Sequence, residues 1–249
     1  MIALIAWRAR ALRPSGALAA VAAGTAATAA GWDWGILLVL YFVSSAALSR
    51  FRGRDKDVLI AGRVEKSGAR DGAQVAANGA LFALSAVAHA FEPRLLWQLT
   101  GVGALAASAA DTWATEIGVL AVARPRSILT MKPVEPGVSG GVTLVGWIAA
   151  IAAAATLALV VRLLDWPATA SLAALAGGMA GCALDSVLGA SLQSRRLCPA
   201  CEMPTEQRIH RCGTSTRHVG GVALLDNDAV NFLATAGGAA VGGVMAALA

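Results

Sequence analysis

Residues 141–164 read GVTLVGWIAAIAAAATLALVVRLL, and Arg162 is the one charged residue in this stretch. A helix that crosses a bilayer needs about 20 consecutive, mainly apolar residues, so this segment is long enough for one span. The whole chain has a matching composition, because 57% of its 249 residues are hydrophobic and only 14% are charged. Soluble domains carry roughly a quarter charged residues. The sequence therefore indicates an integral membrane protein rather than a soluble domain.

Further apolar segments flank this one, so about seven transmembrane helices are expected in an all-α, polytopic fold. They cover residues 16–31, 33–49, 73–91, 95–122, 168–193 and 227–248. The first two are short, and only Gly31-Trp32-Asp33-Trp34 separates them, which predicts a tight hairpin or a re-entrant pair. We expect residues 1–249 to form a single transmembrane helical domain, with a small cytoplasmic Cys/His loop at 194–226 between the last two helices. The arginines before residue 16 would also suit a secretory signal, but the later spans favour a retained first helix.

The distribution of basic residues predicts the orientation. Every Lys and Arg except Arg94 and Arg162 lies in the N-terminus or in a loop after the second, fourth or sixth segment. Basic loops stay in the cytoplasm, so we expect a cytoplasmic N-terminus, an external C-terminus and a location in the cell (inner) membrane. This retention explains the net charge of +5 without a nucleic-acid partner. Trp32, Trp34, Trp97 and Trp166 lie at the opposite segment ends, where an outer aromatic belt is expected.

Ionisable side chains inside apolar segments are costly and are therefore functional candidates. With the topology above, the acidic and amide side chains of five segments fall at one level, in the cytoplasmic half of the bilayer. We expect the site to face the cytoplasm and to contain Asp111, Glu116, Asp185, Asp228, Asn231 and Asn78 as catalytic residues. The alternatives are polar pairs that only hold helices together and a pathway for cations or protons. A pathway would place such groups through the full depth of the membrane.

The stretch 132–143 is rich in glycine and precedes the apolar segment 141–164. Its backbone N–H groups and the following helix N-terminus suit an anion such as a phosphate. The expected phosphate-binding residues are Lys132, Gly137, Ser139, Gly140, Gly141, Thr143 and, from the basic loop 50–72, Arg63 and Lys66, with Arg70 as a further candidate. That basic loop would alternatively be a solvated segment near anionic lipid headgroups. Mg²⁺ would join carboxylates to phosphates, with Asp111, Glu116, Asp185 and Asp228 as its proposed ligands.

The loop after the sixth segment contains a possible zinc site. It holds Cys198-Pro-Ala-Cys201 followed by His210-Arg-Cys212, which supply four ligands with the spacing of a closed tetrahedral Zn²⁺ site. The reducing cytosol argues against disulfides. The alternative is unmetallated thiols, and His218 is a spare candidate ligand. Such a site would stiffen the loop rather than perform chemistry.

Several blocks together resemble the polytopic membrane family that contains plant and cyanobacterial phytyl-phosphate kinase and human transmembrane protein nineteen. They occur in that family's order over nearly the whole chain. They are GAQVAANG at 72–79, SAADTWATEIG at 108–118, GVSGGVTLVG at 137–146, DSVLGASLQ at 185–193 and LDNDAVN at 225–231. The Cys/His loop is not part of these blocks, so the zinc prediction depends on spacing alone.

The resemblance implies phosphoryl transfer from a nucleoside triphosphate, CTP in particular, to a membrane-embedded prenyl monophosphate such as phytyl phosphate. The expected partners are thus a prenyl-phosphate lipid, the nucleotide and the surrounding membrane lipid, with Mg²⁺ as cofactor. A transporter or channel for a cation or lipid phosphate, without phosphoryl transfer, and a membrane scaffold without turnover are the alternative functions.

Overall fold

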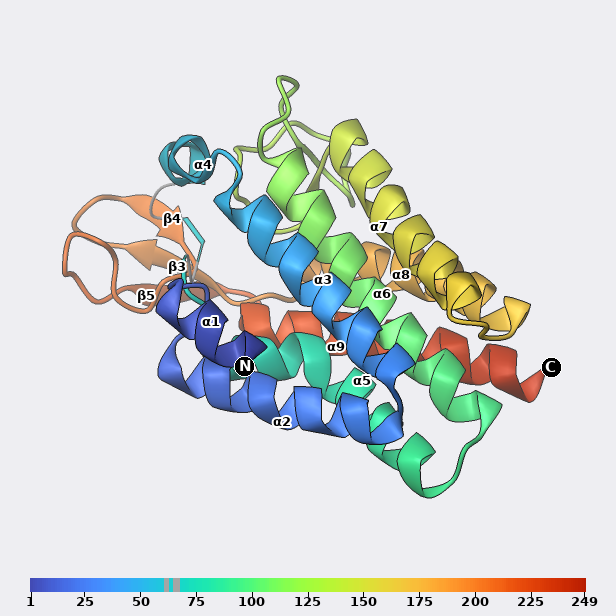
Figure 1. Cartoon of the computed structure of the whole chain (residues 1–249). Helices are drawn as coiled ribbons and strands as arrows, with labels where there is room; N and C mark the ends of the chain where they lie inside the picture. Colours follow the sequence, from blue (N-terminus) through green and yellow to red (C-terminus); the bar gives the residue numbers. More distant parts are fainter. Residues whose placement is uncertain (61–62, 65–67) are drawn as a thin grey trace.

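The computed structural model describes residues 1–60, 63–64 and 68–249, and the described chain is mostly helical (Figure 1). Its elements are α1 (Ile2–Arg8), α2 (Pro14–Ala30), α3 (Trp32–Arg50), α4 (Gly53–Ile60), α5 (Gly72–Phe91), α6 (Leu95–Gly118), β1 (Arg126–Ser127), β2 (Gly141–Val142), α7 (Leu144–Leu163), α8 (Ala168–Ser191), β3 (Arg195–Cys198), β4 (Met203–Thr205), β5 (Arg217–Gly220) and α9 (Asn227–Ala247). The strands form an antiparallel β1–β2 pair and a small antiparallel sheet of order β4-β3-β5.

Each of the seven expected apolar segments contains a helix, but within the described residues five helices are long and apolar enough to cross a membrane. These are α3, α5, α7, α8 and α9. Helix α2 has 17 residues, at the lower limit for a span. Helix α6 is longer, but Asp111, Glu116 and several hydroxyl side chains make it more polar. The structure thus supports five candidate spans instead of seven, and it adds α1, α4 and the strands to the expected all-α fold.

Helix α6 is the central element. It packs against α3, α5, α7, α8 and α9, whereas α2 packs mainly against α5. Every residue from 101 to 110 is buried. Large apolar side chains on the outer helices are instead exposed, as expected of surfaces that contact lipid; examples are Leu18, Val43, Ile148, Leu159 and Leu172. The centre of the bundle therefore consists of the small residues of α6.

Glycines bring α6, α8 and α9 into backbone contact. A Cβ atom added to Gly177 would lie 2.8 Å from the Cα atom of Gly103, and one added to Gly238 would lie 2.5 Å from the Gly103 carbonyl oxygen. One turn further along α8, a Cβ atom on Gly181 would lie 2.3 Å from the Cβ atom of Ala107. Small residues at spacings of four permit this close approach of helices.

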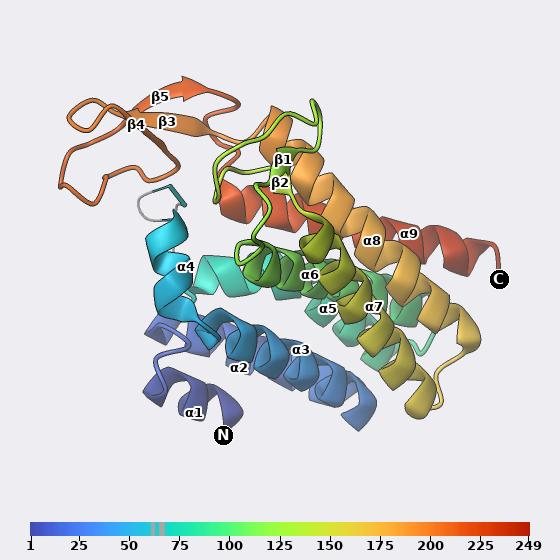
Figure 2. The same cartoon turned by 90° about the horizontal axis from the view of Figure 1, so that it is seen from above.

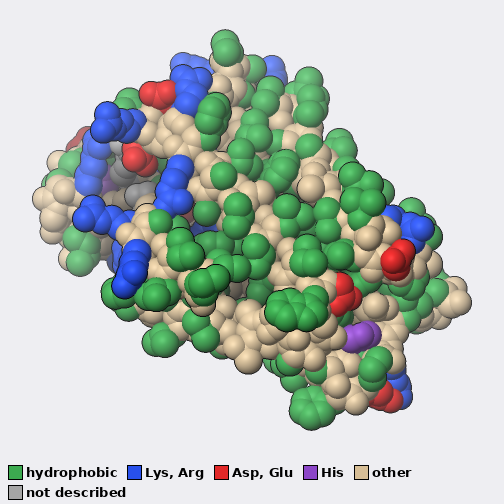
Figure 3. Space-filling view, viewed as in Figure 1, with side chains coloured by type: hydrophobic (Ala, Val, Ile, Leu, Met, Phe, Trp, Pro, Cys, Tyr) green, Lys and Arg blue, Asp and Glu red, His purple; other side chains and the backbone are tan. Residues whose placement is uncertain are grey.

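The helices alternate in direction, so the long loops gather at one end of the bundle. Figures 1 and 2 show the loop with β1 and β2, the sheet β3–β5 and helix α4 at this end, and the short connections at 92–94 and 164–167 at the other. We call it the loop end. Figure 3 shows Lys and Arg side chains around a hollow at the loop end and a largely hydrophobic surface along the middle. The polar starts of α5, α7 and α9 lie at the same end.

The expected aromatic belt at the opposite end is only partly formed. Trp32 is 81% exposed, but Trp34 and Trp166 are buried. The ring of Trp34 packs against Phe82, His89 and Trp166 at centroid separations of 5.0–5.3 Å. Trp34 and Trp166 therefore pack inside the bundle instead of facing a membrane interface.

Changing Gly238 to Ala should destabilise the protein by about 1–3 kcal/mol, because the new methyl group would force α9 away from α6. Gly24 is the matched control, since a Cβ atom added there would have no atom within 4 Å. Gly24→Ala should be neutral or slightly stabilising. Thermal unfolding of the detergent-solubilised variants measures both. Equal transition temperatures for the two variants would contradict the close packing.

Candidate functional site

Asp111 and Asp185 face each other because of the glycine contacts between their helices. The contacting pairs Gly103/Gly177 and Ala107/Gly181 are each four residues apart along α6 and α8, which run in the same direction. The next step of four gives Asp111 and Asp185, one turn further along each helix. Their carboxyl groups lie near enough to interact with each other. Oδ2 of Asp185 is buried and has no hydrogen-bond partner among the described residues.

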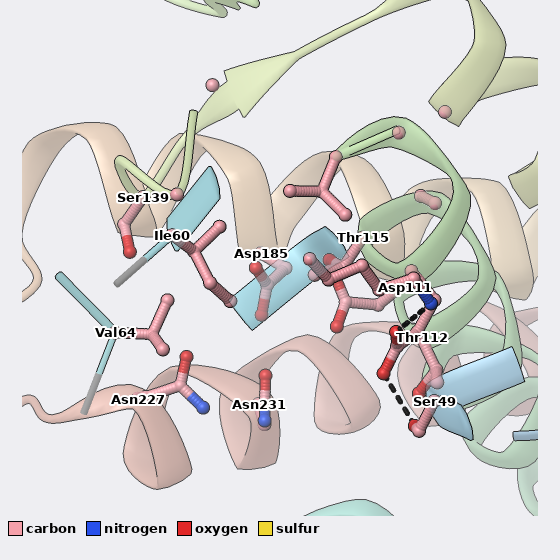
Figure 4. Close-up of a pocket in the computed structure, with 18 of the residues that line it drawn as sticks. Ser49, Ile60, Val64, Asp111, Thr112, Thr115, Ser139, Asp185, Asn227 and Asn231 are labelled. Atoms are coloured by element: carbon pink, nitrogen blue, oxygen red, sulfur yellow. Dashed lines mark hydrogen bonds and ion pairs between the residues drawn. The ribbon is translucent and has the colours of Figure 1, made fainter. Parts of the chain in front are cut away.

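These two carboxylates belong to one cavity of about 530 Å³ at the loop end. This volume is within the range of small-molecule sites in proteins. Figure 4 shows Asp111, Asp185, Asn227, Asn231 and Ser139 around this cavity. The expected site residues that line it are Asn78, Asp111, Glu116, Asp185, Asn231, Gly137, Ser139, Gly140, Gly141 and Thr143. The structure thus brings together most of the acidic, amide and glycine positions expected from sequence.

Glu116 connects α6 with α3 and α4. Its carboxylate accepts a hydrogen bond of 2.5 Å from Ser49 Oγ and forms an ion pair of 2.6 Å with Lys56 Nζ (Figure 4). Lys56 is buried and also donates to the Leu48 carbonyl oxygen. A buried charge needs such a partner, because removing it from water is costly. Glu116 is thus fixed in the cavity wall by two neighbours.

The glycine-rich loop packs closely on α8. Gly140 has φ +75°, and a Cβ atom there would lie 2.4 Å from that of Ala190. Two N–H groups of the expected anion site are bonded within the loop, since Val138 donates to Glu135 and Gly141 donates to Val138. The Thr143 hydroxyl caps α7 by accepting from the Gly146 N–H. The loop is thus a shaped wall of the cavity, with part of its N–H groups already satisfied.

Other expected residues lie elsewhere. Asp228 is in the first turn of α9, but it does not line the cavity. Lys132 is exposed and also lies outside the lining. Arg63 donates to the Pro136 carbonyl oxygen and approaches Glu135 at 3.8 Å. Lys66 lies outside the described residues.

The structure adds cavity residues that were not predicted from the sequence. They are the acidic residue Glu206, the amide Asn227 and the basic residues Arg10, Arg50 and Lys56, whereas Arg70, a phosphate-binding candidate of the basic loop, also lines the cavity. Glu206 belongs to the Cys/His loop, and its side chain accepts a hydrogen bond from Ser139. Spacing in the sequence gave no signal for Glu206. Asn227 could have been found, because it is four residues before Asn231 and shares its helix face.

The Cys/His loop holds a second group of candidate ligands. One ligand atom from each of Cys198, Cys201, His210 and Cys212 lies within 4.8 Å of all the others. The sulfur atoms of Cys198 and Cys212 are 3.6 Å apart, close to the value of about 3.8 Å that a tetrahedral site with Zn–S bonds of 2.3 Å requires. This Cys₃His cluster, predicted from spacing, can hold a metal such as zinc. The spare candidate His218 is outside it.

Hydrogen bonds within the cluster favour a thiolate. Bonds with Thr214 and His210 lower the pKa of Cys212 to about 5, so this group is deprotonated at neutral pH. The hydrogen bond to Cys212 raises the pKa of the Cys201 thiol to about 11. Metal binding requires deprotonated cysteines, so a bound cation would take the place of the Cys201 proton.

Comparisons with known proteins give the family. The family described as "Integral membrane protein DUF92" matches residues 1–239. "Protein PGR" of Arabidopsis thaliana is 31% identical over 94% of this chain and 88% of its own length. Uncharacterized membrane proteins of Methanocaldococcus jannaschii and a Synechocystis species are 32% and 33% identical, over 66% and 67% of this chain and 67% and 66% of their own lengths respectively. No solved structure matches the chain.

Elemental analysis of the purified protein should find about one zinc ion per chain, because the cluster offers the four ligands of a closed site. Cys198→Ser should lose this metal, since the buried Cys198 side chain is one of the four ligands. His218→Ala is the matched control in the same loop and should keep it. Equal zinc contents in Cys198→Ser and the unchanged protein would contradict the assignment.

Proposed function

This chain belongs to the DUF92 family of integral membrane proteins, and we propose that it is a phosphotransferase that converts a membrane-embedded prenyl monophosphate to its diphosphate with a nucleoside triphosphate, CTP in particular. One observation carries the proposal. Two facing carboxylates, Asp111 and Asp185, share a cavity with amide and basic side chains at one end of a helical membrane protein. The blocks that resemble the phytyl-phosphate kinase family contain both carboxylates and about half of the other cavity residues.

The paired carboxylates suit Mg²⁺. Oxygen ligands from one or two carboxylates, completed by substrate phosphates, are typical of magnesium in phosphoryl transfer. Asp111 and Asp185 would hold the ion, whereas Glu116, which is paired with Lys56, and Asp228, which lies outside the cavity lining, would not be direct ligands. The ion would neutralise negative charge on the phosphates. The buried Oδ2 atom of Asp185 fits this role, because a buried carboxylate oxygen needs a partner.

The acceptor is already an anion, so the reaction needs no strong general base. The site must hold two negatively charged groups close together and in line. Arg10, Arg50 and Arg70 line the cavity and would balance this charge. Asn78 and Asn231 would orient the carboxylates and phosphates through their amide groups.

An apolar side of the cavity would accommodate the prenyl chain. Phe42 and Ala46 of α3, Ala114 of α6 and Trp147 of α7 also line the cavity. They belong to α3, α6 and α7, which pack against one another. A substrate with an anionic head and an apolar tail would match this division of the walls.

The cavity would open to the cytoplasm. It lies at the loop end, where the basic residues gather (Figure 3), and basic loops are retained in the cytoplasm. We therefore propose a cell (inner) membrane enzyme that takes its nucleotide from the cytoplasm.

The direct test is the conversion of phytyl or geranylgeranyl phosphate to the diphosphate by purified protein with radiolabelled CTP and Mg²⁺. Asp111→Asn should lower turnover about 100-fold, because a neutral amide binds Mg²⁺ poorly. Asp165→Asn is the matched control, since Asp165 is an exposed residue at the opposite end. Full turnover in Asp111→Asn, or nucleotide-independent flux of ions or lipid phosphate in liposomes without any product, would reject the kinase.

A bulky residue in the apolar wall should alter substrate length preference. Ala46→Trp would fill the space next to Phe42 and should raise the KM for geranylgeranyl phosphate more than that for a short prenyl phosphate. The KM for CTP should not change, because the nucleotide would bind at the polar side. A proportional loss with every prenyl length would argue against a tail site at this wall.

A further inference from the structure

We propose that the metal held by the Cys₃His cluster positions Glu206 in the cavity wall and thereby makes the proposed activity dependent on that metal. The cluster and the cavity are separate sites, but Glu206 belongs to both regions. It lines the cavity and bonds to Ser139, and in the sequence it lies between the cluster residues Cys201 and His210.

The segment that carries Glu206 is anchored at both ends by cluster ligands. Cys201 lies in the turn between β3 and β4, Glu206 follows β4 directly, and His210 comes four residues later. A metal bound to Cys201 and His210 would thus close a short loop that contains Glu206. Metal ligation of this kind contributes folding free energy, because it fixes chain segments that would otherwise be free to separate.

Direct hydrogen bonds connect the segment that carries Glu206 to the cavity wall. The Glu206 N–H donates to the Arg63 carbonyl oxygen at 2.8 Å, and Gln207 Nε2 donates to the Val64 carbonyl oxygen at 3.1 Å. Arg63 in turn donates to the carbonyl oxygen of Pro136. Together with the Ser139–Glu206 bond, these contacts attach the Cys/His loop to the glycine-rich stretch 132–143.

Hydrogen bonds within the Cys/His loop also hold the segment that carries Glu206. The Thr216 hydroxyl donates to the carbonyl oxygens of Gln207 and Arg208 at 2.5 and 3.0 Å, and Arg196 Nε donates to Thr216 Oγ1 at 2.8 Å. The pair Arg196/Thr216 thus ties the Glu206 segment to β3, the strand that ends at Cys198. Movement of the cluster would therefore move Glu206. This makes Glu206 a positioning residue for Ser139 and the glycine-rich loop.

Hydrogen–deuterium exchange of the full-length protein in detergent tests this coupling without any substrate. A chelator that removes zinc should speed exchange at amides 137–141 about tenfold, the equivalent of one hydrogen bond to a charged group, and added zinc should restore protection. Glu206→Ala should produce the same increase at 137–141 while retaining its zinc. His218→Ala should change neither zinc content nor exchange there. Faster exchange confined to residues 195–220 after zinc removal, or normal protection at 137–141 in Glu206→Ala, would overturn the proposal.

A second test measures turnover and rests on the proposed function. With CTP and a prenyl phosphate, zinc removal and Glu206→Ala should lower turnover by the same factor, and zinc removal should have no further effect on Glu206→Ala. If the unchanged protein shows no turnover, the phosphotransferase is rejected but the exchange result still decides the coupling. If turnover is normal and insensitive to zinc, the coupling has no functional role and this inference fails alone.

Discussion

The structure depends on one packing constraint, the backbone contact of α6 with α8 and α9 at Gly103, Gly177 and Gly238. Any side chain larger than hydrogen at these positions would meet backbone atoms. Because α6 and α8 run side by side in the same direction, this contact also fixes their register. About two turns further, that register places Asp111 opposite Asp185. A requirement of helix packing therefore determines the geometry of the candidate site.

Placing carboxylates inside a helical bundle has an energetic cost that the fold offsets in different ways. Glu116 is neutralised by buried Lys56 and bonded to Ser49, so it is stable as part of the wall. Asp111 and Asp185 are neighbours, and their proximity would be unfavourable if both were charged without a cation. Glu116 is thus a structural carboxylate, whereas Asp111 and Asp185 need a further partner. The proposed magnesium site follows from that contrast.

The cavity is closed by loops that come from distant parts of the sequence. The glycine-rich loop packs on α8 through Gly140, and the Cys/His loop reaches it through the Glu206–Ser139 bond. Helices thus provide the two facing carboxylates, whereas loops provide the walls nearest to the polar end. Rigid helices and adjustable loops are a common division in binding sites. In this protein a second candidate metal site offers a way to stiffen the adjustable part.

The membrane class, the seven helical segments and the ligands of the Cys₃His cluster could be predicted from the amino-acid order, because they depend on local hydropathy and on spacing along the chain. The same order indicated that Asp111, Asp185, Asn78 and Asn231 share one level, since alternating spans bring alternate ends together. Which side chains meet is visible only in the folded chain. The Gly103–Gly177 contact, the Lys56–Glu116 pair and the Ser139–Glu206 bond each join residues at least 60 positions apart. Such contacts depend on helix register and loop path, which no local pattern encodes.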